Sequence, residues 1–199
     1  MASAALIDYQ HIPDQAWRRL QSAADERQHP MRLMTIATVD RAGLPNARVL
    51  VLRGASRERR QLWFHTDARS LKVDELRSQP SVCAVGYDPR DDVQLRMFGR
   101  AHLHRDDTIA DQHWEQTTMA VRAVYGSPLA PGEPLPGHDP RTHQHLETLD
   151  AKDSAAGRRN FLVIAVDIDR IEWVQLDGAR QRRARMRRER DWAIEPLAP

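Results

Sequence analysis

The chain opens with a segment whose apolar residues recur at helical spacing. Residues 13–28 begin with Pro-Asp and place Trp17, Leu20 and Ala24 on one helix face. This pattern predicts an amphipathic helix that packs one side against the rest of the protein.

After this helix the apolar residues come in short runs separated by turn residues, which is typical of strands. Residues 31–39 and 44–53 flank a polar, glycine-containing turn and predict a β-hairpin. Further runs predict strands at 61–66, 81–87 and 93–105, one or two strands within 161–176, and a basic hairpin at about 180–186 and 190–195.

Helical and irregular segments interrupt the strands. An acidic start, apolar residues at helical spacing and Pro80 predict a short helix from about Ser70. Asp106 and Asp107 can cap a helix that runs through Ile109 and Trp114 toward Met119. A loop rich in Pro and Gly covers 126–140, and a polar helical stretch follows at 141–157.

The number and order of these elements predict the fold class. About seven strands with a few short helices favour a mainly β protein, a β-barrel or strongly curved sheet with peripheral helices. The irregular alternation argues against a doubly wound parallel sheet, and no Gly-rich phosphate loop is present. We expect one domain over 1–199, with an N-terminal helical extension at 1–30 and C-terminal strands at 170–199.

Composition narrows the class of protein. Hydrophobic residues make up 41% and charged residues 29%, which indicates a globular chain. No apolar run reaches membrane-spanning length, and the N-terminus lacks a signal-peptide pattern. Cys83 is the single cysteine, so we expect a reducing cytoplasm and interpret Cys83 as a small core residue.

The formal net charge is only +2, but arginines concentrate between Ala179 and Arg190. As a free arm, this segment could grip the phosphates of a nucleic acid. Strand-like sequences flank it on both sides, which favours a basic strand with one or two arginines directed into a site. Binding to nucleic acid is therefore the less favoured hypothesis.

A second basic group combines Arg48 and Arg53, which close the two ends of one apolar run, with Ser70 and Lys72. If strands 44–53 and 61–66 are neighbours, the helix near Ser70 begins beside the arginines. Cations and a hydroxyl at a helix N-terminus form a phosphate site. The alternative, charges at strand ends in water, has similar weight from the pattern alone.

Histidines and acids reveal little further chemistry. His102 with His104 and His143 with His145 have His-x-His spacing, but no acidic or cysteine ligand accompanies them, so we predict no metal site. His65 either lines a pocket or packs at a strand end. No catalytic residue can be assigned from spacing, which indicates that a cofactor carries any redox chemistry.

Four sequence blocks resemble one known family. RVLVLR, WFHTDARSLKVDEL, VQLRMFGRAHL and the ending IEWVQL…RARM…RDWAIEPLAP follow the order seen in the pyridoxamine 5′-phosphate oxidase-like family of FMN-binding split barrels. The resemblance extends from about Met31 to the end. It implies a split barrel, FMN as cofactor, and a homodimer with the flavin at the interface.

The resemblance also implies which residues contact the flavin. Arg48 takes the place of an arginine at the FMN phosphate, Lys72 is retained at the helix start, and Leu71 replaces an arginine. Gln94 matches a glutamine at the flavin ring, and Arg185 an arginine of the C-terminal hairpin. The implied cofactor set is Arg48, Val49, Leu50, Val51, His65, Thr66, Ser70, Leu71, Lys72, Gln94, Ser127, Trp173 (or Val174) and Arg185.

The substrate side departs from the family pattern. Arg53 stands where a substrate-binding lysine is usual, and Arg183 falls within an altered Arg-x-His motif. Trp114, Thr118 and Arg122 replace the family's helix residues. The resemblance implies an FMN-dependent oxidoreductase for a small, anionic substrate bound by Arg53, Trp114, Arg122 and Arg183, rather than pyridoxamine phosphate itself. A flavin-binding module without catalysis is the alternative.

Overall fold

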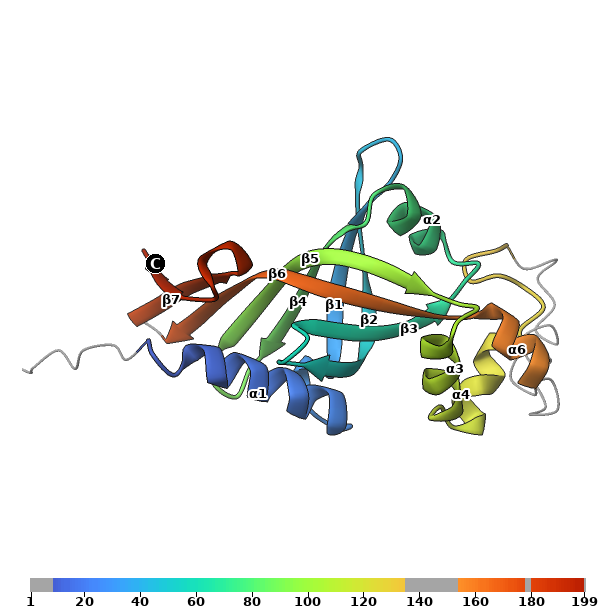
Figure 1. Cartoon of the computed structure of the whole chain (residues 1–199), viewed down its shortest axis with the longest axis horizontal. Helices are drawn as coiled ribbons and strands as arrows, with labels where there is room; N and C mark the ends of the chain where they lie inside the picture. The colour runs from blue at the N-terminus through green and yellow to red at the C-terminus, as the bar shows by residue number, and fades with distance from the viewer. Residues whose placement is uncertain (1–8, 135–153, 178–179, 199) are drawn as a thin grey trace, which may run out of the picture.

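The computed structural model describes residues 9–134, 154–177 and 180–198 (Figure 1). The strands are β1 Leu33–Val39, β2 Pro45–Ser56, β3 Gln61–Asp67, β4 Ser81–Asp88, β5 Val93–His104, β6 Phe161–Asp177, β7 Arg180–Arg187 and β8 Ile194–Leu197. The helices are α1 Ile12–Asp25, α2 Leu71–Ser78, α3 Thr108–Glu115, α4 Met119–Tyr125 and α6 Ser154–Asn160, with 3₁₀ turns η1 Pro30–Arg32 and η3 Arg188–Arg190.

The strands form one antiparallel sheet that closes on itself. Their order is β3-β2-β1-β4-β5-β6-β7-β8. The edge strand β3 also pairs with β6, which closes the strands from β3 to β6 into a ring. Six strands therefore make a barrel, and β7 and β8 extend from it as a separate ribbon (Figure 1). This confirms the predicted barrel class.

The long strand β6 is what closes the barrel. It runs without interruption over 17 residues and pairs with β5, β7 and β3 along different parts of its length. A shift in the β5–β6 register lies between Phe98 and Gly99. A Cβ atom at Gly99 would lie 2.0 Å from the carbonyl oxygen of Asp167, so only glycine allows the strands to approach here.

The core fills the barrel and the space beneath α1. Alternate residues of the strands point inward, as the period of two predicts. Trp17 and Leu20 of α1 are buried against them, which confirms the predicted amphipathic helix. The largest fully buried side chains from the strands include Met34, Ile36, Leu52, Leu62, Phe64, Leu95, Met97 and Trp173.

Helices α3 and α4 cover the outside of the barrel near β3 and the start of β6. Trp114 and Tyr125 from these helices form a small cluster with Phe161 and Val163. The sequence predicted one helix running toward Met119, but α3 ends at Glu115, and a separate helix, α4, begins at Met119. Each helix in the described part of the chain is too short or too polar to cross a membrane.

Some of the sequence predictions need correction, and others concern residues outside the described part of the chain. Cys83 is half-buried opposite Phe98 on the outer face of β4, and not in the barrel core. The sheet has eight strands, and the barrel itself uses six of them. Residues 135–153, which hold most of the predicted polar helix and His143 and His145, lie outside the described residues.

Candidate functional site

Arg48 lies at one end of the barrel, beneath α2. Its Nη2 donates to Glu75 Oε2 at 2.8 Å, and its Nη1 donates to the hydroxyl of Thr38. Asn46 donates to the other oxygen of Glu75 at 2.8 Å. The neighbouring strands therefore bring Arg48 to the α2 helix, as the strand pairing predicted.

Lys72 completes a pair of cations at this end. Its ammonium group donates to the Thr66 hydroxyl at 3.2 Å. Burial and then the nearby Arg48 guanidinium lower the pKa of Lys72. The buried Ser70 is the N-cap of α2, but its hydroxyl makes no capping hydrogen bond. Two cations, a hydroxyl and the unpaired N–H groups of a helix start suit a phosphate group.

Glu75 is a member of this cluster that the sequence interpretation missed. Burial tends to raise the pKa of Glu75, but hydrogen bonds from Thr38, Asn46 and Arg48 outweigh burial and leave the pKa below its usual value. The carboxylate is therefore ionised and partly neutralises Arg48. Its position three residues after Lys72, on the same helix face, was the available signal.

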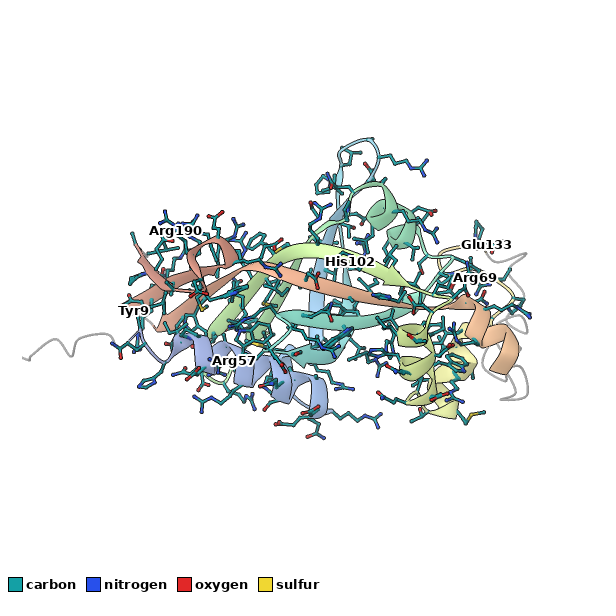
Figure 2. The ribbon with its side chains drawn as sticks, in the orientation of Figure 1. Tyr9, Arg57, Arg69, His102, Glu133 and Arg190 are labelled. Atoms are coloured by element: carbon teal, nitrogen blue, oxygen red, sulfur yellow. The ribbon has the colours of Figure 1, made fainter. Side chains whose placement is uncertain are left out.

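Arg69 precedes the α2 cap but is already paired. It forms a two-point contact with Asp67, at 3.0 and 2.7 Å, and the contact with Asp67 raises the pKa of Arg69. Its Nη1 also reaches the carbonyl of Pro128 at 3.4 Å. Figure 2 shows Arg69 and Glu133 at the same end of the molecule. The neighbouring Leu71 is 73% exposed and contributes no charge.

Gln94 belongs to a different surface. Gln94 pairs with Tyr87 on one side and Val174 on the other, and Val174 pairs with Arg183. Side chains at directly paired positions share a face of the sheet. Tyr87 is 43% exposed, so this row lies on the outer face of the barrel.

Arg185 lies in the next row of the same outer face. It pairs with Glu172, which in turn pairs with Arg96. Its guanidinium contacts both oxygens of Glu195, at 3.1 and 3.0 Å. Arg185 and Arg187 of the predicted basic hairpin thus both contact Glu195 of the neighbouring strand β8.

Trp173 points the opposite way from Gln94. It pairs with Leu95, is only 2% exposed, and has the guanidinium of Arg19 5.7 Å from its ring centre. Of the two alternatives for the flavin-side position, Val174 shares the outer face with Gln94 and Trp173 does not.

The two groups of predicted flavin contacts therefore lie on opposite faces of one sheet. Arg48 pairs with the fully buried Ile36 and faces inward, whereas Gln94 faces outward. Next to Arg48 on the same strand, Val49 is 57% exposed on the outside of β2, and Val51 is half-buried. One chain alone does not bring Arg48 and Gln94 to the same ligand.

Arg53 lies on a third surface, with two histidines. It is half-buried, and its Nε has no hydrogen-bond partner in the described part of the chain. His65 Nε2 and His113 Nδ1 are 3.0 Å apart. Burial, then His113 and Arg53, lower the pKa of His65 to about 3. Burial also raises the pKa of the adjacent Tyr125 to about 12, so its hydroxyl stays neutral.

The other predicted substrate residues are not gathered around Arg53. Arg122 donates to the carbonyl oxygens of Trp114 and Glu115, at 2.7 and 3.0 Å, and so caps the end of α3. Trp114 is buried in the helix cluster, and Arg183 is exposed on β7. His113 was missed because only the fold brings α3 against β3.

Ser127 follows α4, and its hydroxyl donates to the carbonyl of Leu129 at 3.1 Å. Because Arg69 contacts the intervening Pro128, this loop lies near the start of α2. Residues 126–134 of the predicted long loop are described, and the remainder, 135–140, is not.

The closed antiparallel barrel, with the cations of Arg48 and Lys72 at one end, defines the class of the protein as a split β-barrel. The sequence profile of the pyridoxamine 5′-phosphate oxidase FMN-binding domain matches residues 14–105. A pyridoxamine 5′-phosphate oxidase-related, FMN-binding protein of Nostoc punctiforme is 27% identical, with a TM-score of 0.75 over 100% of both chains. The resemblance found in the sequence is thereby confirmed: the chain is similar to proteins of the pyridoxamine 5′-phosphate oxidase-like family, and its fold is the FMN-binding split barrel.

A second solved structure shares the fold at lower identity, and a sequence relative matches a shorter segment. PhzG from Burkholderia lata, solved with tetrahydrophenazine-1-carboxylic acid, has a TM-score of 0.75 at 21% identity and covers 94% of this chain and 92% of its own. The pyridoxine/pyridoxamine 5′-phosphate oxidase of Leptospira interrogans is 39% identical over 66 residues, 33% of this chain and 30% of that protein. The matched segment thus spans about a third of that relative. At the level of the family, an FMN-binding, oxidoreductase-like role is supported.

Proposed function

We propose that this protein binds FMN and acts as an FMN-dependent oxidoreductase on a small anionic molecule. The observation that carries the proposal is the placement of Arg48 and Lys72 together at the N-terminus of α2. Glu75 pairs with Arg48, and Asp67, the other carboxylate near Lys72, is already paired with Arg69. Net positive charge therefore remains at this partly buried site. A phosphate group would compensate that charge.

A second copy of the chain would complete the site. The inward-facing Arg48 and the outward-facing Gln94 cannot meet one planar ligand within one protomer. The outer face near β1 and β2 carries the apolar side chains of Leu33, 61% exposed, and Val49, 57% exposed. We infer a homodimer that covers this face and in which one copy holds the phosphate while the other presents Gln94 and Arg185.

The residues of the chain have distinct roles in this proposal. Arg48 and Lys72 hold the phosphate and so fix the position of the ring. Gln94 donates or accepts a hydrogen bond at the ring edge. Arg53 supplies positive charge for an anionic substrate. FMN, when bound, supplies the two-electron chemistry by accepting or donating hydride.

The direct test compares FMN binding in two variants of the same region. Arg48→Ala/Lys72→Ala should weaken FMN binding at least about a hundredfold, because each charge-assisted contact contributes roughly 1.5–3 kcal/mol. Arg77→Ala is the matched control, since Arg77 is also on α2 but is half-exposed and pairs with Asp74. Dissociation constants would come from quenching of flavin fluorescence, and the bound cofactor would be identified by its absorption spectrum and mass.

Riboflavin separates phosphate binding from ring binding. Its affinity should change little in the double variant because it lacks the phosphate. Equal FMN affinity in the double variant and the unaltered protein would contradict the proposed phosphate site. A protein that neither contains nor takes up FMN would contradict the proposed function as a whole.

A flavin-binding module without catalysis is the second candidate. It is favoured by Arg122, which caps α3 instead of turning toward Arg53. In that case the bound flavin would be reduced by dithionite and reoxidised by air, but no small anionic donor would reduce it.

A further inference from the structure

We propose that the groove between α1 and α3 is a carboxylate-binding site, in which Arg53 supplies the charge and His113 supplies an N–H donor that His65 fixes in place. The interpretation of this site as a substrate-binding site rests on the proposed function. Binding of the anion itself does not require a flavin, so the two can be tested separately.

The groove has a volume of about 330 Å³. Arg53 and Gly54 of β2 and Trp63 of β3 line one side of it, and Gln21 of α1 and His113 of α3 line the others. Small-molecule sites begin at about this volume, so the groove suits a compact ligand.

Gly54 lets the indole of Trp63 take its place in the groove wall. A Cβ atom at position 54 would lie 2.8 Å from Trp63 Cε3, which is too close for any other residue without movement of the ring. The register of β2 against β3 shifts between Leu52 and Gly54, so the wall is built at an irregularity of the sheet. An aromatic wall of this kind favours a planar ligand.

Arg53 gives the groove a positive charge that is not neutralised locally. No ion pair to Arg53 is present in residues 9–134, 154–177 and 180–198, and its buried Nε lacks a partner there. Asp25 also lines the groove but is exposed at the end of α1. A half-buried guanidinium without an ion-pair partner is readily compensated by an oxyanion.

The His65–His113 pair decides what His113 offers to the groove. One nitrogen of the 3.0 Å contact must donate, and the other must accept. The second nitrogen of His65, Nδ1, is buried without a partner. A buried N–H left unpaired is costly, so the proton of His65 belongs on Nε2, which donates to His113 Nδ1.

This arrangement leaves the proton of His113 on its own Nε2. His113 is then an N–H donor and not an acceptor toward the groove that it lines. Burial lowers the pKa of both imidazoles, so the pair stays neutral and the donor is retained at neutral pH. A donor and a guanidinium together select an anion over a neutral molecule of the same shape.

The ligand class that fits is a carboxylate carried on a small planar ring. The carboxylate would contact Arg53 and His113, and the ring would lie along Trp63. This set differs from the substrate residues that the family resemblance implied, because Trp114, Arg122 and Arg183 do not line the groove.

Calorimetric titration of the purified protein with benzoate tests the proposal. Benzamide is the neutral probe of equal shape, and inorganic phosphate is the oxyanion without a ring. We expect benzoate to bind at least about tenfold more tightly than either. Equal binding of benzoate and benzamide, no binding of benzoate, or tighter binding of phosphate would each overturn the proposal.

Variants assign the effect to the named residues. Arg53→Gln should abolish the preference for benzoate, and His113→Phe should weaken benzoate about tenfold. His113→Gln keeps an N–H donor and should retain most of the affinity. His102→Gln is the control, because the side chain of His102 on β5 (Figure 2) is 55% exposed and does not line the groove. Loss of benzoate binding in the control as well would overturn the assignment.

Two further measurements make the outcome independent of folding and of FMN. The ¹⁵N shifts of the imidazoles report the tautomers directly, and an Nδ1–H tautomer of His113 would overturn the role given to His65. Arg48→Ala/Lys72→Ala should still bind benzoate while losing FMN. Retained benzoate selectivity with no FMN uptake would refute the proposed function and leave this site standing.

Discussion

At the scale of single residues, the buried environment of His65 disfavours the protonated imidazole. It packs edge-on against Phe161, with ring centres 4.8 Å apart, and touches His113. Its pKa is about 3, whereas an unfolded histidine has a pKa near 6.5, so the folded protein holds His65 neutral. Below about pH 6.5 the unfolded chain binds a proton that the folded chain excludes.

This difference predicts the pH dependence of stability. The contribution of His65 is present above about pH 6.5 and is lost as the pH falls toward 3, by at most about 1.4 kcal/mol per pH unit. Urea denaturation between about pH 7 and about pH 5 should show a shallower loss in His65→Phe than in the unaltered protein. His29 shifts in the same direction and remains in both proteins, so equal slopes would contradict this account.

Glu75 is the second residue whose replacement has a defined outcome. Its ionised carboxylate accepts from Arg48 and would face a bound phosphate. Glu75→Gln should therefore tighten FMN binding about tenfold and lower the free energy of unfolding by about 1–3 kcal/mol. Asp74→Asn, on the same helix but 61% exposed, should change neither. Weaker FMN binding in Glu75→Gln would show that the carboxylate serves to position Arg48.

At the scale of elements, α1 is held to the β4–β5 turn by a buried carboxylate. Asp88 is fully buried and accepts from Arg19 at 2.7 Å and from Arg90 at 2.8 Å. Hydrogen bonds from Arg90, which outweigh burial, lower the pKa of Asp88 to about 2. Because α1 also provides one wall of the groove, this contact positions Gln21 as well.

Removing the carboxylate should loosen α1. Asp88→Asn should destabilise the protein by about 3–5 kcal/mol and speed amide exchange in α1. Asp91→Asn is the control, since Asp91 contacts Arg19 from an exposed position and should contribute at most about 1 kcal/mol. Amide exchange in α1 that is unchanged in Asp88→Asn would show that apolar packing alone holds the helix.

At the scale of the whole molecule, the prediction concerns two copies of the chain. If the proposed dimer shares the flavin, Val49→Arg should weaken dimerisation and FMN binding together, by about tenfold or more each. Val124→Arg, which changes a valine of α4 that is 67% exposed, should affect neither. Light scattering after gel filtration gives the oligomeric state. A monomer that keeps its FMN affinity would contradict the shared site.

Some of this organisation follows from local sequence. The apolar runs in residues 61–66 and 93–105 predicted strands that the structure confirms, because strand-forming sequence is a property of the segment itself. Pro80 predicted the end of α2 for the same kind of reason. The grouping of Arg48 with Lys72 required only that two consecutive strands pair.

Contacts between segments that are distant in sequence were decided only by the tertiary structure. The pairing of Gln61 with Asp167 closes the barrel, and no local pattern specifies a register across that separation. The meeting of His65 with His113, and the opposite facing of Arg48 and Gln94, follow from that closure. Residue types and their period thus determined the strands and the chemistry available. The closed sheet decided which side chains share a surface, because burial and strand pairing act across the whole chain at once.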